Sequence, residues 1–406
     1  MGEWKKYKLK DVCTILGDGL HGTPIYDDKG EIFFINGNNL KDGRISIKND
    51  TKRVPYSEAN KYKKPLNNRT ILVSINGTIG NIAKYRDEKC ILGKSACFFN
   101  VKENVDLNFI YYVVANQQFK NTITQLATGT TIKNVSLETM RNYTFRIPPL
   151  SIQKQIGKIL SSLDDKIELN RRINDNLEQQ AQALFKSWFV DFEPFKDGKF
   201  VESELGRIPE GWRVERLGSV CKCLLGGTPS RNKEEYWNGK IAWINSGEIN
   251  EFRITKPSEY ITQEGLKKSA TKLLPKKTTV LAITGATLGQ VSLLEIDSCA
   301  NQSVIGLLEN EDIFYEYIYP LIKNRIDDLC SHMTGGAQQH INKNNVEQLE
   351  ILVPPQKILV EYKQIATPIY SLISNICFES QKISKLRDSL LPRLMSGELK
   401  LDKTNN

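Results

Sequence analysis

The chain has 406 residues, a length that accommodates roughly two to four domains. Hydrophobic residues make up 40% and charged residues 25%, which is the balance of a soluble globular protein. Fifty-six Lys and Arg against 47 Asp and Glu give a formal charge of +9, which permits a polyanionic partner such as nucleic acid without requiring one.

Several classes of protein are excluded by simple patterns. No apolar run approaches the ~18–20 residues of a membrane-spanning helix, and the segment 1–6 lacks the apolar stretch of a secretory signal. Eight cysteines without a CxxC pair, together with three histidines, argue against a structural zinc site and against a disulfide scaffold. We therefore expect a reduced, cytoplasmic protein that binds no metal.

The chain repeats one plan at an offset near 208 residues. Thr70–Gly80 and Thr279–Gly289 are the most similar segments. Further matches keep the same order along the chain: Trp4 with Trp212, Cys13 with Cys221, Phe34–Asn36 with Trp243–Asn245, Cys90 with Cys299, and Ile132 with Ile341. An ordered set of matches with so few gaps predicts an internal duplication.

Each half changes character at a Pro-Pro pair, Pro148-Pro149 or Pro354-Pro355. Before the pair, short β-rich runs alternate with Gly, Asn and Asp turns, and after it about 40 residues have helix-forming composition. The predicted fold class is α+β, with two globular mixed α/β domains separated by two long antiparallel coiled-coil helices in pseudo-two-fold symmetry. The expected segments are a first domain at 1–149, a first helix at 150–195, a linker at 196–210, a second domain at 211–355, and a second helix with its tail at 356–406.

Both predicted helices carry heptads. The first places Ile156, Leu163, Asn170, Leu177 and Leu184 seven residues apart. The second has two such lines, Ile369, Ile376, Ile383 and Leu390, and Ile365, Leu372, Glu379 and Leu386. Apolar positions repeated in this way are typical of a coiled coil, although an amphipathic helix lying on a globular domain is the alternative. A parallel pair is feasible because the second half could supply the return path, but like units favour the antiparallel arrangement.

Each helix has one polar residue near the middle of an apolar line, Asn170 and Glu379. An antiparallel pair with matched midpoints brings these two residues close together. The hypothesis is that they set the register of the helices, as a single polar core residue can do. The alternative is that both lie at the solvated edge.

Three segments resemble one known family. Ala183–Phe195 and Leu386–Leu399 resemble the central and distal conserved regions of Type I restriction-modification specificity subunits, and Gly206–Trp212 is similar to a further motif of that family. The alternation of two target-recognition domains with two spacer helices covers the whole chain. One departure is Pro354-Pro355-Gln356, where Pro148-Pro149-Leu150 keeps the usual Pro-Pro-Leu form.

The resemblance implies a non-catalytic subunit that selects the DNA sequence. It implies two methylation subunits that bind S-adenosylmethionine and methylate adenine, and two restriction subunits that use ATP and Mg2+. This chain itself would bind no cofactor, no membrane and no small-molecule substrate. Each domain would read one half of an asymmetric double-stranded DNA target, and the helix pair would set the unread spacer.

The residues support a bipartite target independently of the resemblance. Two similar domains held apart by a rod predict half-sites about one helical turn, ~34 Å, apart on one face of the duplex. Because the halves differ in most surface residues, the half-sites should differ in sequence.

Motifs for catalysis are missing from the sequence. Leu92–Ser95 is similar to the end of a phosphate-binding loop, but Glu88 stands where the first glycine belongs. No motif for adenine methylation or S-adenosylmethionine binding is present. Two alternatives stay open: an enzyme for methylation or cleavage with unrecognised motifs, and a coiled-coil adaptor with two protein-binding domains.

Candidate DNA-reading residues are polar side chains in loops at equivalent places in the two halves. They are Thr23, Asn36, Asn38, Asn39, Thr78, Thr131, Lys133, Asn134, Thr228, Ser230, Arg231, Asn245, Ser246, Glu248, Thr287, Gln338, Gln339, His340 and Lys343. For each one the alternative is an ordinary turn or surface residue, and this alternative is strongest for Thr78 and Thr287.

Apolar residues near the helix ends have two interpretations. Packing against the other helix and the neighbouring domain is one, and docking of the methylation subunit is the other. The residues are Phe185, Trp188, Phe189, Phe192, Leu390 and Leu391.

The positive charge is unevenly distributed. Residues 1–150 hold 23 basic and 14 acidic side chains, whereas residues 196–355 hold 19 and 21. We therefore expect the second domain to hold phosphates through clustered basic residues or with help from partner subunits. The candidates are Arg231, Lys267, Lys268, Lys276, Lys277 and Lys343.

Overall fold

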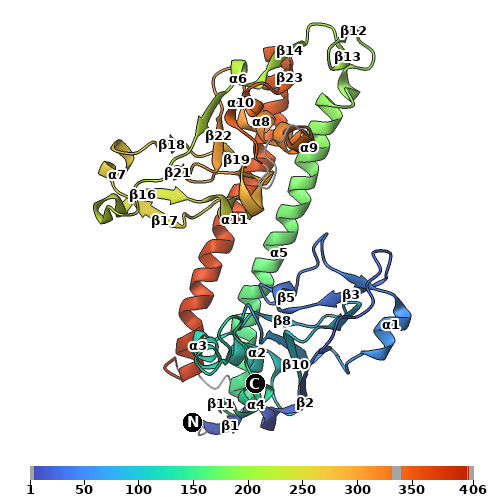
Figure 1. The fold of residues 1–406 in the computed structure, drawn as a ribbon, viewed down its shortest axis with the longest axis vertical. Coiled ribbons are helices and arrows are strands. Elements are labelled where there is room, and N and C mark those ends of the chain that lie inside the picture. Colours follow the sequence, from blue (N-terminus) through green and yellow to red (C-terminus); the bar gives the residue numbers. More distant parts are fainter. Residues whose placement is uncertain (1–3, 332–339, 400, 402–406) are drawn as a thin grey trace. The chain divides into compact units, whose positions relative to one another are not determined.

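The computed structural model describes residues 4–331, 340–399 and 401. The chain divides into two compact units: unit 1 comprises Met1–Ile167 with Ile383–Asn406, and unit 2 comprises Glu168–Lys382. Two long helices, α5 (Leu150–Phe189) and α11 (Gln356–Ser396), each contribute one part to either unit (Figure 1). The chain is a mixed α/β protein with long helices, and the finer segment boundaries expected from the sequence stay predictions.

Unit 1 contains one four-stranded antiparallel sheet and several smaller ones. The four-stranded sheet has the order β2 (Cys13–Asp18), β10 (Ala96–Val101), β7 (Thr70–Ser74), β8 (Ile82–Lys84). The smaller sheets are β6 (Arg53–Val54) with β3 (Ile32–Ile35) and β9 (Cys90–Leu92), β1 (Lys5–Lys8) with β11 (Thr144–Ile147), and β4 (Leu40–Lys41) with β5 (Arg44–Ile45). The helices are η1 (Leu9–Val12), η2 (Gly37–Asn39), α1 (Tyr56–Lys61), α2 (Leu107–Ala115), α3 (Gln117–Gln125) and α4 (Leu137–Asn142).

Unit 2 repeats this plan. Its four-stranded antiparallel sheet has the order β15 (Lys222–Leu225), β22 (Val304–Leu308), β19 (Thr279–Ala282), β20 (Val291–Leu293). The other sheets are β17 (Glu259–Ile261), β16 (Trp237–Ile244), β21 (Ser298–Ala300) and β18 (Leu273–Leu274), then β14 (Arg213–Arg216) with β23 (Glu350–Val353), and the hairpin β12 (Phe200–Ser203) with β13 (Gly206–Pro209). The helices are η3 (Glu193–Phe195), α6 (Leu217–Val220), η4 (Glu234–Tyr236), η5 (Ser246–Asn250), α7 (Gln263–Lys267), η6 (Gly285–Thr287), α8 (Tyr315–Asn324), α9 (Ile326–Ser331) and α10 (Lys343–Glu347).

The two units share their strand topology. The order β2-β10-β7-β8 in unit 1 corresponds to the order β15-β22-β19-β20 in unit 2. Each unit also has a second sheet that contains a parallel pair, β3 with β9 in unit 1 and β16 with β21 in unit 2. The first and last strands of each globular part, β1 with β11 and β14 with β23, pair antiparallel. This correspondence agrees with the offset near 208 residues in the sequence.

Strand β7 shows why the middle residues of these strands are apolar. Its five residues are all buried. Ile71 and Val73 belong to the core that also contains Phe109 of α2, whereas Leu72 packs with Ile35 of β3 in another core. Because successive side chains of a strand point to opposite faces, a sheet covered on both faces needs apolar residues at neighbouring positions, and the polar residues Thr70 and Ser74 stand only at the ends of β7.

An aromatic cluster fixes the end of α5 in unit 2. Phe185 and Phe189 are buried, and the Phe189 ring lies 4.7 Å from that of Tyr362 on α11 and 4.8 Å from that of Tyr317 on α8. Trp188 and Phe192 are partly buried against the same core, and in unit 1 Leu390 and Leu391 pack in the same way. These side chains therefore pack within their units, while a role in docking stays a prediction.

Removal of the Phe189 ring should strongly destabilise the protein. We expect Phe189→Ala to lower the free energy of unfolding by about 3–5 kcal/mol, because it leaves a cavity among aromatic rings. Urea denaturation of the full chain measures this loss. The neighbouring Val190, 41% exposed, provides the control, and Val190→Ala should cost less than about 0.5 kcal/mol. Equal losses for the two variants would contradict the packing role.

The helix segments within each unit run antiparallel. In unit 2, Asn170 Nδ2 donates to Glu379 Oε2 at 2.7 Å, and Phe189, farther along α5, meets Tyr362, which is earlier on α11. Asn170 is buried and also donates to Ser380 Oγ at 3.1 Å. The two polar residues are thus direct partners. That they set the register stays a prediction.

One expected line of the helix pair is wrong in detail. The heptad line predicts that Ile365, Leu372 and Leu386 of α11 face the other helix, but their side chains are 47%, 46% and 48% exposed. The buried apolar residues of α11 in unit 2 are Leu359, Tyr362, Ala366, Tyr370, Ile373 and Ile376, of which Ile376 belongs to the other expected heptad line. A helix that covers a domain core as well as another helix buries a wider and differently placed face than a heptad line describes.

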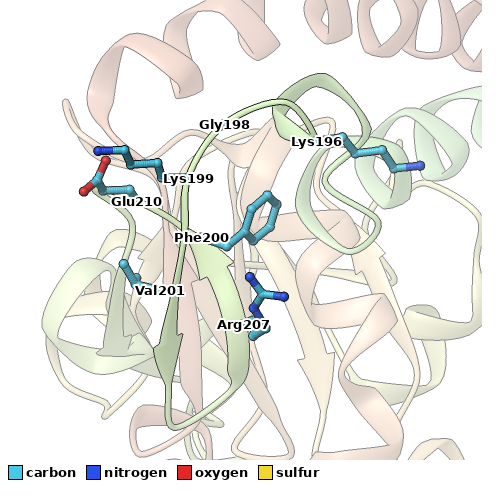
Figure 2. A pocket seen from close by; sticks show the side chains of 7 residues that line it. All are labelled: Lys196, Gly198, Lys199, Phe200, Val201, Arg207 and Glu210. Atoms are coloured by element: carbon cyan, nitrogen blue, oxygen red, sulfur yellow. The ribbon is translucent and has the colours of Figure 1, made fainter.

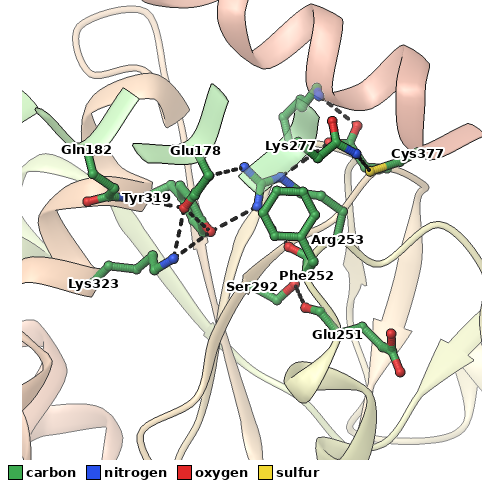
Figure 3. Close-up of polar contacts among 12 residues, drawn as sticks. Glu178, Gln182, Glu251, Phe252, Arg253, Lys277, Ser292, Tyr319, Lys323 and Cys377 are labelled. Atoms are coloured by element: carbon green, nitrogen blue, oxygen red, sulfur yellow. Dashed lines mark hydrogen bonds and ion pairs between the residues drawn. The ribbon is translucent and has the colours of Figure 1, made fainter. Parts of the chain in front are cut away.

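A buried network of charges holds α5 to the globular part of unit 2. The Arg253 side chain is fully buried, and its Nη2 lies 2.7 Å from Glu178 on α5. Glu178 also accepts hydrogen bonds from Lys323 Nζ at 2.8 Å and from the Tyr319 hydroxyl at 2.9 Å (Figure 3). Burial alone would raise the pKa of Glu178, but Arg253 and Lys323 outweigh it and lower this pKa to about 2.

The other side of Arg253 faces a second carboxylate. Arg253 Nε lies 3.8 Å from Glu295 Oε1. Glu295 Oε2 is bound by Lys277 Nζ at 2.6 Å and by the Ser374 hydroxyl of α11 at 2.6 Å. The network therefore connects the globular part of unit 2 to both of its helix segments.

Candidate nucleic-acid interface

In unit 1 the predicted DNA-reading loops meet at the turn 93–95, which links β9 to β10. We call this turn and its equivalent in unit 2 the central turns. The first loop begins where Leu20 N donates to Leu92 O at 2.7 Å, and Gly93 N donates to Ile35 O at 2.8 Å, directly before the second loop. The turn is therefore bonded to the starts of two predicted loops.

Ser95 joins the remaining loops to the central turn. Its hydroxyl accepts from Gly37 N at 2.8 Å and donates to Asn36 Oδ1 at 2.9 Å. Its carbonyl accepts from Ile75 N at 2.9 Å, and Ile75 O in turn accepts from Val135 N at 2.8 Å. One serine thus connects the loop at 36–39 with the segments before Thr78 and after Asn134.

Two further bonds link the third and fourth loops directly. Asn76 Nδ2 donates to Asn134 Oδ1 at 3.2 Å, and Gly77 N donates to Lys133 O at 3.3 Å. Thr78, Thr131 and Lys133 are exposed beside these contacts. The four loop regions chosen from polarity alone are therefore brought together in unit 1.

Unit 2 assembles its loops in the same way around 301–303. Gly227 N donates to Ala300 O at 2.8 Å, and Asn301 N donates to Ile244 O at 3.0 Å. These bonds attach the loop that carries Thr228 and the loop that begins at Asn245.

The third and fourth loops of unit 2 join through Ile283. Its N donates to Ser303 O at 2.9 Å, and its O accepts from Ile341 N at 3.0 Å. The Thr228 hydroxyl donates to Gln302 Oε1 at 2.5 Å. Unit 1 therefore presents one polar surface built from four loops and a central turn. The described residues of unit 2 form the equivalent surface from three loops, the central turn and the end of the fourth loop from His340 onwards.

The predicted residues differ in how accessible they are. Those exposed are Thr23, Asn38, Thr78, Thr131, Lys133, Thr228, Ser230, Arg231 and His340. Those half-buried are Asn36, Asn134, Asn245, Ser246, Glu248 and Lys343. Gln338 and Gln339 lie outside the described residues. The reading roles of all these residues stay predictions.

Two of the predicted residues are buried. Asn39 is 7% exposed, and its Nδ2 donates to Ser46 O at 3.2 Å, which makes it a turn-stabilising residue. Thr287 is 8% exposed in η6. Direct contact of these two side chains with a base is a poor expectation, since a side chain inside a turn presents no polar edge to a DNA groove.

Arg231 is exposed but already has partners. Its guanidinium lies 3.6 Å from the centre of the Trp237 ring, and its Nη2 donates to Glu259 Oε1 at 2.9 Å. Hydrogen bonding to Glu259 raises the pKa of the guanidinium. Surface pairs of this kind are weak, so Arg231 can exchange the carboxylate for another anion.

The expected basic cluster of unit 2 is mostly paired with carboxylates. Lys277 lies in the buried charge network, where its Nζ is 2.6 Å from Glu295 Oε2, and its predicted contact with phosphate stays a prediction. Lys268 pairs with Glu264 at 2.7 Å, and Lys343 pairs with Glu347 at 3.0 Å, both on the surface.

A hollow of about 680 Å³ lies apart from these loops, at the hairpin β12–β13. Lys196, Lys199 and Arg207 line it, and Figure 2 shows Arg207 beside the Phe200 ring. Lys196 is paired with Glu193 at 2.7 Å. Sequence patterns did not indicate this hollow, because its basic residues are scattered through a linker.

The described residues contain neither a cluster of metal ligands nor a membrane-spanning helix. Among residues 4–331, 340–399 and 401, no group of His, Cys, Asp and Glu side chains could hold a metal ion. Within the same ranges, no helix is long and apolar enough to cross a membrane.

Comparison with known proteins decides the family. A model described as the Type I restriction modification DNA specificity domain matches residues 1–179 and again residues 209–388. This chain belongs to the Type I restriction-modification specificity family. As a specificity subunit it is non-catalytic and contains two target-recognition domains. The double match also reproduces the internal offset of the sequence.

Individual relatives agree with this family. The Type I restriction enzyme MjaIX specificity subunit of Methanocaldococcus jannaschii is 26% identical, over 99% of this chain and 94% of that protein. A putative type I specificity subunit of Mycoplasma pneumoniae is 30% identical, over 80% and 82%. The crystal structure of a Type I S subunit from M. genitalium superposes with a TM-score of 0.57 at 17% identity, over 97% and 96% of the two chains, which supports the fold.

Proposed function

We propose that this specificity subunit recognises a bipartite, asymmetric sequence in double-stranded DNA, with one half-site read by each unit. The observation that supports this is the pair of loop surfaces, one in each unit, built by equivalent hydrogen bonds around the two central turns. Their exposed side chains differ, Lys94 in one turn and Gln302 in the other, so the half-sites should differ as well.

The long helices serve as the spacer in this proposal. They form an antiparallel pair, and their length sets the number of unread base pairs. The contact between Asn170 and Glu379 fixes their alignment, since a shift of either helix would leave a buried polar group without its partner.

Catalysis belongs to partner subunits. Two methylation subunits dock on this chain, bind S-adenosylmethionine and modify adenine, and two restriction subunits supply ATP- and Mg2+-dependent cleavage in the cytoplasm. The exposed apolar side chains of α11, Ile365 and Leu372, provide surface for such docking. This chain binds none of these cofactors.

The decisive experiment maps modified adenines. The full chain is expressed with its cognate methylation subunit in a host that lacks adenine methylation, and the modified positions are read by long-read sequencing. We expect one motif made of two different half-sites separated by a fixed number of arbitrary bases. The full chain expressed without the methylation subunit should leave the host DNA unmodified.

Three outcomes would contradict the proposal. A motif of one uninterrupted block would show that the units do not read separate half-sites. Methylation by the chain alone, with S-adenosylmethionine, would favour an enzyme. Absence of any salt-sensitive, sequence-selective binding to duplex DNA by the complex would favour the adaptor alternative.

A further inference from the structure

The two central turns occupy the same place in their units. The turn 93–95 links β9 to β10, and the turn 301–303 links β21 to β22. Ala96 N donates to Gly93 O at 3.0 Å, and Val304 N donates to Asn301 O at 3.1 Å, so the turns are closed in the same manner. At the middle of each turn there is one exposed side chain, Lys94 or Gln302.

We propose that Lys94 and Gln302 are equivalent specificity-determining residues, each contacting a base edge within the half-site of its own unit. This inference rests on the proposed function. It concerns two residues that loop polarity did not identify, because the first belongs to the segment Leu92–Ser95, which is similar only to an incomplete phosphate-binding loop.

The backbone around these residues is held on both sides. In unit 1, Gly93 N is bonded to Ile35 O, and Ser95 is bonded through its hydroxyl and its carbonyl to two different loops. In unit 2, Asn301 N is bonded to Ile244 O, and Ser303 O to Ile283 N. The backbone that carries each side chain is therefore positioned before DNA binds, so that only the side chain itself has to be ordered on binding.

The side chain of Gln302 is itself oriented. Thr228 donates its hydroxyl proton to Gln302 Oε1 at 2.5 Å. The amide Nε2 keeps two protons to donate, and the oxygen keeps a second lone pair. A glutamine amide presented in this state matches the N7 and N6 edge of adenine in the major groove. Thr228 then acts as a positioning residue, not as a reader.

Lys94 has the chemistry for a different base. Its ammonium donates only, and none of the described residues pairs with it. In the major groove the matching acceptors are O6 and N7 of guanine. A phosphate contact is the competing role for a lysine. The equivalent place of unit 2 holds a glutamine, whose amide offers a donor and an acceptor that match one base edge, and this equivalence favours base contact for Lys94 as well.

The test uses reciprocal substitutions in the complex with the methylation subunit. Lys94→Gln should change the base preference at one position of one half-site by roughly tenfold or more, and leave the other half-site unchanged. Gln302→Lys should do the same in the opposite half-site. The measurement is the frequency of modified adenines across all variants of the wild-type motif in host DNA.

The matched controls change another lysine and another glutamine, which lie near the ends of β10 and β22 that are far from the central turns. Lys10 lies next to the strand end at which Cys13 pairs with Val101, and Gln356 donates to Glu311 O shortly after β22 ends. Lys10→Gln and Gln356→Lys should leave both half-sites unchanged. Thermal unfolding of every variant checks that the fold is preserved, as expected for exposed positions.

Thr228 provides a second and independent arm. Thr228→Val removes the hydroxyl that orients Gln302 and should weaken discrimination at the position read by Gln302, whereas Thr228→Ser should restore it. A merely structural role of Thr228 would lower modification at all sites equally, without a change in preference.

The outcomes separate this proposal from the one on which it rests. Unchanged preference in Lys94→Gln and Gln302→Lys overturns the reading role. An equal loss at all sequences, with a reduced salt dependence of binding, identifies a phosphate contact and also overturns it. Failure of the wild-type complex to produce a two-part motif would overturn the proposed function itself.

Discussion

Replacement of Arg253 by methionine should destabilise unit 2 by about 3–5 kcal/mol, the largest loss that we expect from one polar substitution in this chain. The guanidinium is fully buried between Glu178 and Glu295, whose side chains are 11% and 2% exposed. Methionine fills similar space but leaves two buried carboxylates without their shared cation. Urea denaturation of the full chain, followed by fluorescence, measures the change.

The matched control is Arg231, a second arginine of the same unit. It also pairs with a glutamate and stacks on an aromatic ring, but its side chain is 52% exposed. Arg231→Met should therefore cost less than about 1 kcal/mol. Similar losses for the two variants would show that burial does not govern the strength of the Arg253 network.

The same network predicts that the stability of the folded protein depends on pH in the acidic range. The pKa of Glu178 is lowered to about 2 in the folded protein, below the value near 4.5 expected for an unfolded glutamate. Its contribution to stability is therefore fully present above pH 5 and is lost as the pH falls from about 5 towards 2. Glu178→Gln should reduce the slope of stability against pH in this window. An unchanged slope would contradict the assignment.

The architecture was largely predictable from local signals. The Pro-Pro pairs marked the starts of both long helices, which begin at Leu150 and Gln356. The ordered matches between the halves anticipated a common strand topology. The buried side of α11 was less predictable, because a heptad line assumes a single partner helix, whereas Tyr362 and Tyr370 of α11 also pack against α8 and the globular core.

The candidate interface shows a similar division. Polar loops at equivalent places were recognisable because turns rich in Asn, Gly and Thr stand out between apolar strands. The contacts between these loops were not recognisable from the sequence, because the hydrogen bonds that join Ser95 to Gly37 and Ile75 link residues distant in sequence. The burial of Arg253 was not predictable either, because a charged residue is usually exposed and only tertiary contacts enclose this one.

Lengthening of both helices should change the spacer of the DNA target without changing either half-site. The proposed insertion places four residues of high helix propensity after Ile167 in α5 and four after Lys382 in α11, where the division between the units falls. Four residues add about one helical turn, ~6 Å, and turn the following face by only about 40°. At ~3.4 Å per base pair, the spacer should grow by one or two base pairs.

An insertion of two residues at the same points is the control for this experiment. It changes the length less, but it rotates the following helix face by about 200°, so the buried sides of α5 and α11 can no longer face their partners in both units. We expect this variant to lose modification, whereas the four-residue variant gains a motif with the original half-sites and a longer gap. Mapping of modified adenines reads half-sites and spacer together. An unchanged spacer in an active four-residue variant would show that the helices position the units without measuring the DNA between them.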